Sequence, residues 1–503
     1  MIDFSKARNG SLTCSVGGKY LHSVYNPERE SERFVLQLQC DFSPKVVILT
    51  EPGLSYCARF LRQRFPCAKI AAIRFCKDFS KFDAEWDFVF FADENLDNAL
   101  FNVCGEEMLS SALFASWQSS ETLFPSESER AWQKIKSAVL KSRDILATRS
   151  FFSKRWLKNS VRFFSFAQKM AAVRAGKSDI VVAASGPSLK LAMETLKKYR
   201  EKFFLIAVSS ALKPLLSNKI TPDLCISTDG GQWAKRHLEI LFENPEISVA
   251  LSAESATPYF VLAKNPVVPL FYGDAPECVF AKNCGIPAIK AFRNGTVSGT
   301  AVQCALGLTN ARVFCCGLDL SEAKGFQHTQ PNALDEINAG FENRLQPRST
   351  RLSLSGRPNG SLSLYRDWFS AQTGDFAERV FRLAGAKLNP LGNITDLSAE
   401  NFEDIFKKMP KKEKPVIKID SESSFENLEK RREIIKKNLQ EIKNLPIKDE
   451  KSVFWLKNVF PVEFLQYEKY VGFEKQKYAE KDLLDKRNEF FSEIISDFEK
   501  KLQ

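Results

Sequence analysis

The sequence contains no uninterrupted apolar run of the roughly eighteen residues that a membrane-spanning helix needs. Its first ten residues, MIDFSKARNG, also lack the apolar centre of a secretory signal peptide. These two absences predict a soluble, cytoplasmic protein without a transmembrane segment.

Metal-binding and disulfide patterns are missing as well. The twelve cysteines lie between Cys14 and Cys316, and no two of them have the C-x-x-C spacing of zinc sites. A chain of this size can bury a core without disulfides, so we expect buried thiols in a reducing compartment and no bound metal. Histidine is scarce: only His22, His237 and His328 are present.

What is present is typical of a globular protein of several domains. The 503 residues are 44% hydrophobic and 26% charged, and 42 of them are Phe. The formal net charge of +11 indicates anionic partners. The charge fits phosphates or acidic sugars as well as nucleic acid, and we expect no nucleic-acid partner.

The stretch 179–199 organises the chain. The apolar run Ile180–Ala184 is typical of a strand buried on both faces of a parallel sheet. The turn 185–188 (SGPS) follows, and 189–199 then has helical spacing of apolar residues. A strand, a turn of small residues and a helix form a phosphate-binding arrangement, because N–H groups point outward at the helix start. An ordinary tight turn in an α/β domain fits these residues equally well.

Repeated strands and helices predict an α/β fold with a doubly wound, mostly parallel central sheet. The candidate strands are Ile180–Ala184, Phe203–Val208, Leu224–Ser227, Ser248–Leu251, Val267–Phe271, Ile289–Phe292 and Arg312–Cys316. We predict a nucleotide-sugar-binding catalytic domain at 179–400. A smaller N-terminal domain at 1–110 would combine a β-hairpin at 11–25 with a short α/β series.

Two further regions complete the predicted organisation. Residues 111–178 are expected to form a helical connector, and the basic, aromatic stretch 151–177 fits a packed helix better than a membrane surface. Residues 401–503 are expected to form a helical appendage after a Lys/Pro linker at 407–418. Ser423 and Glu426 have the spacing of a capping box at its first helix. The appendage would pack on the core or hold a protein partner.

Small and polar residues follow the predicted strands, where the carboxyl ends of a parallel sheet form its ligand crevice. The candidate ligand-binding residues are Ser185, Gly186, Pro187, Ser188, Ser209, Ser210, Asp229, Glu254, Thr296, Ser298, Gly299 and Thr300. Beyond the last strand, Asp319 and His328 are candidate catalytic residues, since a histidine can serve as general base or acid. The long polar segment 329–364 is a candidate lid or acceptor-binding loop.

The motifs that carry these residues resemble a known family. VVAASGPSLKLAMETLKKY, LIAVSSALKPLLSNKITPDLCISTDG and GTVSGTAVQCALGLTNARVFCCGLDLS are similar to the central domain of motility-associated factor proteins. Those proteins are flagellin glycosyltransferases whose central domain is described as pterin-diphosphokinase-like. GKYLHSVYNPERESERF also resembles the segment that opens them. The same motifs are similar to family 42 sialyltransferases, which use CMP-activated sugars.

The resemblance implies a metal-independent glycosyltransferase without a cofactor. It would transfer a nonulosonic acid, such as pseudaminic or legionaminic acid, from CMP to Ser or Thr of flagellin and support motility. In that comparison the turn 186–188 with Ser298 and Gly299 borders the CMP, Asp229 lies in the cleft, and His328 is the one histidine downstream of the Ser-Gly turn. Two alternatives stay open: a 6-hydroxymethylpterin diphosphokinase, and a non-catalytic scaffold for flagellin or a nucleotide sugar.

Overall fold

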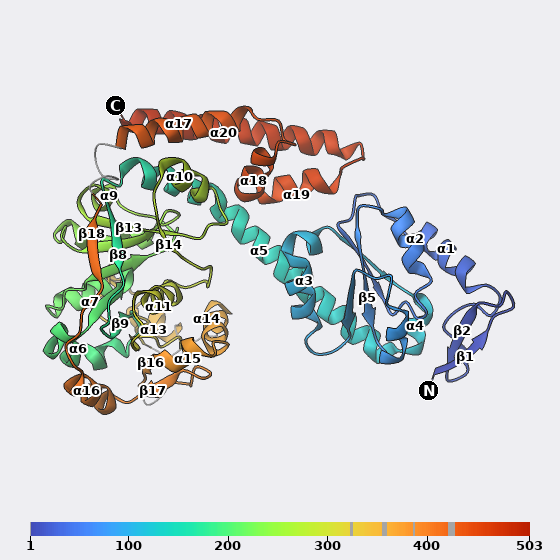
Figure 1. The fold of residues 1–503 in the computed structure, drawn as a ribbon, viewed down its shortest axis with the longest axis horizontal. Helices are drawn as coiled ribbons and strands as arrows, with labels where there is room; N and C mark the ends of the chain where they lie inside the picture. The colour runs from blue at the N-terminus through green and yellow to red at the C-terminus, as the bar shows by residue number, and fades with distance from the viewer. Residues whose placement is uncertain (1, 322–324, 355–359, 386–387, 421–427, 503) are drawn as a thin grey trace. The chain divides into compact units, whose positions relative to one another are not determined.

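The chain forms two compact units in a computed structural model that describes residues 2–502 except 322–324, 355–359, 386–387 and 421–427 (Figure 1). The first unit combines Met1–Lys154 with Leu445–Gln503, and the second is Arg155–Asn444. The long helix α5 (Pro125–Phe166) carries the chain from one unit into the next.

The first unit is built on a small parallel sheet with strand order β6-β5-β4-β7. These strands are β4 (Val46–Thr50), β5 (Lys69–Arg74), β6 (Phe88–Phe91) and β7 (Ala112–Ser116). Successive residues of β4 enter different cores: Val47 and Leu49 pack on one face of the sheet, whereas Val46 and Ile48 pack on the other. Burial on both faces explains why this strand is an unbroken apolar run.

The first unit also contains a second sheet and several helices. An antiparallel sheet of β1 (Ile2–Lys6), β2 (Leu12–Val16) and β3 (Lys19–Tyr20) contains the hairpin that the sequence predicts. The helices are α1 (Pro27–Gln37), α2 (Cys57–Arg64), α3 (Leu96–Ser110), α4 (Gln118–Leu123), α18 (Glu450–Val459), α19 (Pro461–Lys469) and α20 (Lys475–Leu502).

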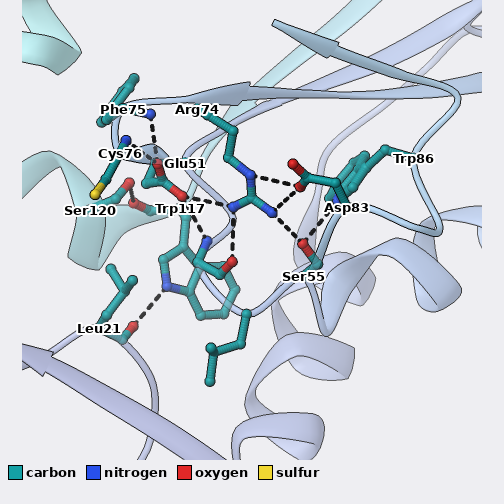
Figure 2. Close-up of polar contacts among 12 residues, drawn as sticks. Leu21, Glu51, Ser55, Arg74, Phe75, Cys76, Asp83, Trp86, Trp117 and Ser120 are labelled. Atoms are coloured by element: carbon teal, nitrogen blue, oxygen red, sulfur yellow. Dashed lines mark hydrogen bonds and ion pairs between the residues drawn. The ribbon is translucent and has the colours of Figure 1, made fainter. Parts of the chain in front are cut away.

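A buried ion pair joins the ends of β4 and β5 (Figure 2). The Arg74 and Glu51 side chains are both 0% exposed, and Arg74 Nη1 donates to Glu51 Oε1 over 2.8 Å. Glu51 Oε2 also accepts the N–H groups of Phe75 and Cys76 at 2.6 and 3.1 Å, while Arg74 Nη2 reaches Ser55 Oγ at 2.6 Å. Arg74, Glu51 and Ser55 are therefore bonded to one another at this end of the sheet.

The second unit contains an 11-stranded sheet with the path β17-β16-β15-β9-β10-β11-β12-β13-β8-β18, and β14 pairs with β13. All of its neighbouring strands are parallel except β8 and β18. The strands are β8 (Lys169–Arg174), β9 (Ile180–Ala183), β10 (Phe204–Val208), β11 (Leu224–Ser227), β12 (Ser248–Ser252), β13 (Pro266–Phe271), β14 (Ile289–Lys290), β15 (Val313–Cys316), β16 (Val380–Leu383), β17 (Thr395–Leu397) and β18 (Val416–Ile419). All seven strands predicted from the sequence are present, within a few residues at their ends.

Helices connect these strands and complete the second unit. They are α6 (Leu189–Lys198), α7 (Leu212–Ser217), α8 (Ala234–Leu238), α9 (Tyr259–Lys264), α10 (Glu277–Cys284), α11 (Val297–Leu308), α12 (Ala333–Ala339), α13 (Arg348–Leu354), α14 (Gly360–Ser370), α15 (Asp375–Arg379), α16 (Ala399–Lys408) and α17 (Leu428–Asn444). Helix α11 lies against β9, β10 and β15. The expected doubly wound α/β class is therefore confirmed.

Two sequence predictions need correction. Residues 111–178, expected to be helical, also contain β7 and β8, because a short apolar run fits a strand as well as a buried helix. The presumed linker at 407–418 includes most of β18, whose residues 416–419 pair with 171–174 of β8. Its lysines suit an exposed edge strand as well as a linker. The expected capping box at Ser423 and Glu426 lies outside the described residues.

The aromatic face of α5 packs as predicted. The rings of Phe163 and Phe164 are buried, and the Phe164 centroid lies 5.5 Å from that of Phe271 and 5.6 Å from that of Phe280.

All twelve cysteines are free thiols. In the part of the chain that the structure describes, no helix combines the length and the apolar character needed to cross a membrane.

Candidate functional site

The direction of winding changes between β9 and β15. From β9 the chain builds outward through β10 to β13, whereas β16 and β17 are added beyond β15 on the other side. In doubly wound sheets the ligand crevice opens at the carboxyl ends of the strands beside such a point. The turns that follow β9 and β15 therefore lie where a ligand site is expected.

These two turns are in direct contact. The Gly186 N–H donates to the Gly317 carbonyl oxygen over 2.8 Å. A Cβ on Gly186 would lie 2.5 Å from that oxygen, and a Cβ on Gly317 (φ +73°) would lie 2.4 Å from the Ala184 oxygen. Both positions therefore require glycine for backbone packing. Pro187, at the tip of the first turn, is exposed.

The start of α6 holds an internal anion. Asp319 Oδ2 accepts the Ser188 N–H at 2.8 Å, and Asp319 Oδ1 accepts the Ser188 hydroxyl. An N–H group at a helix start is where the sequence predicts a phosphate. In this structure the Asp319 carboxylate occupies that position, which makes Asp319 a partner of the turn.

A second layer of hydrogen bonds joins this turn to the segment after Asp319. Ser210 Oγ donates to Ser185 Oγ at 2.8 Å, while Ser209 is buried at the end of β10. Thr329 donates its N–H to the Ser185 carbonyl oxygen and its hydroxyl to the Gly186 carbonyl oxygen, both over 2.7 Å. Asn332 Nδ2 donates to the Ser210 carbonyl oxygen at 3.3 Å. The segment that contains His328 is therefore fastened to the first turn.

The predicted residues at the start of α11 are largely occupied by one another. Thr296 is the N-cap, and its Oγ1 accepts the Ser298 N–H at 3.3 Å. A Cβ on Gly299 would lie 2.7 to 2.9 Å from the side-chain amide of Asn294, which lies 3.5 Å from the buried Thr300 hydroxyl. The glycine at 299 thus makes room for Asn294, a residue that the sequence did not single out.

His328 has a histidine neighbour that sequence reasoning did not pair with it. Its ring centroid lies 6.5 Å from that of His237, which belongs to α8. Burial lowers the pKa of His237 to about 4, and the charge of His328 acts in the same direction. Burial also lowers the pKa of His328, while the Asp335 carboxylate opposes that shift. A neutral imidazole at neutral pH can accept a proton.

Asp229 and Glu254 lie near each other. Asn159 Nδ2 donates to the carbonyl oxygens of Gly230 and Glu254 at 3.4 and 2.8 Å. The Ala256 N–H donates to the carbonyl oxygen of Asp229. Asp229 Oδ1 accepts the N–H of residue 231 at 2.7 Å. The Glu254 side chain is buried and bonds to Arg293, a contact between residues 39 positions apart that no local pattern indicates.

The predicted residues thus form three groups on the second unit: the turns at 185–188 and 317–319 with Ser210, the start of α11, and Glu254 with Asp229. The structure adds His237, Arg293, Asn294 and Thr329 to them. Among the described residues no group of three His, Cys, Asp or Glu side chains has the arrangement of a metal site.

Comparisons with known proteins agree with this architecture. A family model described as 6-hydroxymethylpterin diphosphokinase MptE-like matches residues 154–325. An uncharacterized protein of Treponema pallidum (strain Nichols) is 30% identical over 308 residues, which cover 61% of this chain and 68% of the relative.

A solved structure extends the similarity to nearly the whole chain. The MAf glycosyltransferase of Magnetospirillum magneticum AMB-1 aligns with a TM-score of 0.52 over 99% of this chain and 90% of that chain, at 13% identity. At this identity the alignment shows the fold. It confirms the fold expected from the resemblance to motility-associated factor proteins, and the similarity to family 42 sialyltransferases stays a prediction.

Proposed function

We propose that this chain, which belongs to the same protein family as the Treponema pallidum relative, is a glycosyltransferase. It transfers a nonulosonic acid from a CMP donor to Ser or Thr of flagellin. The observation that carries the proposal is the contact between the Gly186 and Gly317 turns at the switch point of the sheet, in a fold shared with a MAf glycosyltransferase. That is where doubly wound proteins bind nucleotides.

The residues of the second unit have distinct roles in this proposal. CMP lies over the carboxyl ends of β9 and β15, bordered by the turn 185–188 and by the start of α11. That helix has 12 residues, and its dipole favours the phosphate near Thr296 and Ser298. The Asp319 carboxylate holds the Ser188 turn in shape.

The reaction is a substitution at the anomeric carbon. The acceptor hydroxyl oxygen attacks that carbon, the bond from the carbon to the phosphate oxygen breaks, and CMP leaves with the electron pair. His328 takes the proton of the acceptor hydroxyl as general base. Its lowered pKa favours the neutral imidazole that this role requires. Groups that bind the leaving phosphate lower the barrier further.

Transfer to a purified acceptor tests the proposal. The protein is incubated with flagellin and CMP-activated N-acetylneuraminic, pseudaminic or legionaminic acid, and the mass of flagellin is then measured by mass spectrometry. We expect a mass increase of one nonulosonate residue or a multiple of it with one of these donors. Unchanged flagellin with all three donors contradicts the proposal, and His328→Ala serves as the control for non-enzymatic addition.

The family model that matches residues 154–325 favours a second candidate, a pterin diphosphokinase. Transfer of diphosphate from ATP to 6-hydroxymethylpterin would release AMP and would need Mg²⁺ held by carboxylates. Asp229, Glu254, Asp274 and Asp319 are the acidic residues at the strand ends, and Glu254 and Asp274 are bonded to Arg293. Release of AMP that depends on the pterin would favour this candidate over the transferase.

A further inference from the structure

Arg293 binds two carboxylates with its two edges. Its Nη1 and Nη2 donate to the two oxygens of Glu254 at 3.0 and 2.8 Å. Its Nε and Nη2 donate to the two oxygens of Asp274 at 2.8 and 2.9 Å. Both contacts have the two-pronged geometry by which guanidinium groups recognise carboxylates and phosphates.

The two carboxylates differ in their exposure to solvent. The Glu254 side chain is 4% exposed, whereas the Asp274 side chain is 56% exposed. Separating Glu254 from Arg293 would leave the buried Glu254 carboxylate without a compensating charge, so this bond is costly to break. The ion pair with Asp274 is exposed to solvent, and exposed ion pairs contribute little to stability. An incoming anion can therefore replace Asp274 at small cost.

The guanidinium is also fixed in orientation. Its Cζ lies 4.2 Å from the ring centroid of Tyr272 and 5.5 Å from that of Trp156, distances at which cation–π contacts are effective. With Glu254 on its buried edge, the group presents the Nε–Nη2 edge toward Asp274. This edge is therefore arranged in advance for a planar, two-oxygen anion.

A buried acid beside this group supplies a second observation. Glu277 is 1% exposed; its Oε1 accepts the Gly273 N–H at 3.3 Å, and its Oε2 has no hydrogen-bond partner within the described chain. Burial, reinforced by the charge of Glu254, raises the pKa of Glu277 to about 7. When protonated, this carboxyl adds no negative charge to the group and has an unused hydrogen-bond donor.

We propose that Arg293 is an oxyanion receptor in which Asp274 is a built-in occupant, and that a carboxylate or phosphate of the ligand displaces Asp274 from the Nε–Nη2 edge while Glu254 stays bound. The proposal rests on the proposed function and deepens it, because a nonulosonic acid has a carboxylate and its CMP donor has a phosphate. No covalent bond changes in this step.

Titration calorimetry on the full chain distinguishes the two oxyanions. The probes are CMP, inorganic phosphate, N-acetylneuraminic acid and the methyl ester of that acid, which lacks the negative charge. The test variant is Asp274→Asn, which removes the competing charge without touching the interior. The matched control is Asp375→Asn, which removes the exposed Asp of another ion pair, that with Arg379.

We expect Asp274→Asn to strengthen binding of the free acid, or of CMP and phosphate, by about three- to tenfold, the range set by loss of an exposed ion pair and one like charge. Asp375→Asn should leave binding unchanged, and the methyl ester should bind no better to either variant. Arg293→Lys should weaken the same probe at least about tenfold, because an ammonium group lacks the two-pronged geometry.

Three results would overturn the receptor: equal affinities for wild type and Asp274→Asn, equal strengthening for acid and ester, or no binding of any of the anionic probes. Thermal melting of Arg293→Lys shows whether the variant is folded, and Asp274→Asn carries the test if it is not. A chain that shows the Asp274 effect but never modifies flagellin would keep the receptor and refute the transferase, so the two failures are distinguishable.

Discussion

Ser188 and Asp319, 131 residues apart, form the contact that closes the start of α6. The carboxylate of Asp319 accepts both the N–H and the hydroxyl of Ser188, the first of these at 2.8 Å. The chain thereby supplies its own anion to a helix start that would otherwise attract one from solution. This contact also fixes the turn after β9 against the turn after β15.

Asp319→Ala should lower the free energy of unfolding by about 1–3 kcal/mol, because the buried Ser188 N–H loses its charged acceptor. Urea denaturation of the purified variant measures this value. Asp375→Ala, at an exposed position, should cost less than about 0.5 kcal/mol. Equal stability of Asp319→Ala and wild type would show that the contact contributes nothing to the turn.

Two glycines of α11 should respond to alanine with opposite signs. At Gly299 the new Cβ would lie 2.7 Å from Asn294 Cγ, so Gly299→Ala should destabilise the protein by about 1–3 kcal/mol. A Cβ on Gly307 would meet no atom within 4 Å beyond the backbone of its own helix. Gly307→Ala should therefore stabilise the protein by up to about 1 kcal/mol through helix propensity. Thermal melting compares the two variants. Adding Asn294→Ala to Gly299→Ala should recover part of the loss.

His328→Ala should leave CMP binding nearly unchanged and reduce transfer to flagellin by a factor of about 10² to 10⁴, the usual effect of losing a general base. Calorimetry with CMP and steady-state kinetics separate the two quantities. The variant also removes the ring that lies beside His237. Normal turnover would assign the base to another group, with Asp319 the next candidate.

Stability should fall as the pH is lowered through the range of the histidine pair. Burial keeps the pKa of His237 at about 4 in the folded protein, below its ordinary value of about 6.5. Between these two values the unfolded chain binds more protons than the folded one, so the free energy of unfolding decreases from pH 7 to pH 5 by up to about 2 kcal/mol. Urea unfolding of wild type and His237→Gln at both pH values tests this prediction. The free energy of unfolding of the variant should decrease less than that of wild type, and equal decreases would contradict the prediction.

The buried ion pair of the first unit gives a prediction independent of the transferase. Glu51→Gln leaves the fully buried Arg74 with a neutral partner on one side and should destabilise the protein by about 3–5 kcal/mol. Glu28→Gln, which breaks the exposed pair with Arg59, should cost less than about 1 kcal/mol. Chemical denaturation ranks the two variants, and similar losses would show that burial of the pair does not matter.

The sequence by itself determined seven of the eleven strands in the sheet of the second unit. The run Ile180–Ala184 and its counterparts form strands because their residues must be buried on both sheet faces, and this requirement is local. It also identified 185–188 as a turn of small residues between a strand and a helix, whereas the packing of Gly186 on the Gly317 oxygen came from the structure. Short segments such as β7 and β18 were missed because a few apolar or basic residues fit more than one structure.

Only the tertiary structure decided which side chains meet. Asp319 lies on Ser188, Asn294 lies over Gly299, and His237 lies beside His328, although each residue alone is compatible with a solvated loop or helix. Likewise, Arg293 lies between a buried and an exposed carboxylate because β12, β13 and β14 pair side by side. Local patterns specify which residues enter the sheet, whereas contacts across the crevice arise from packing between elements that are far apart in the chain.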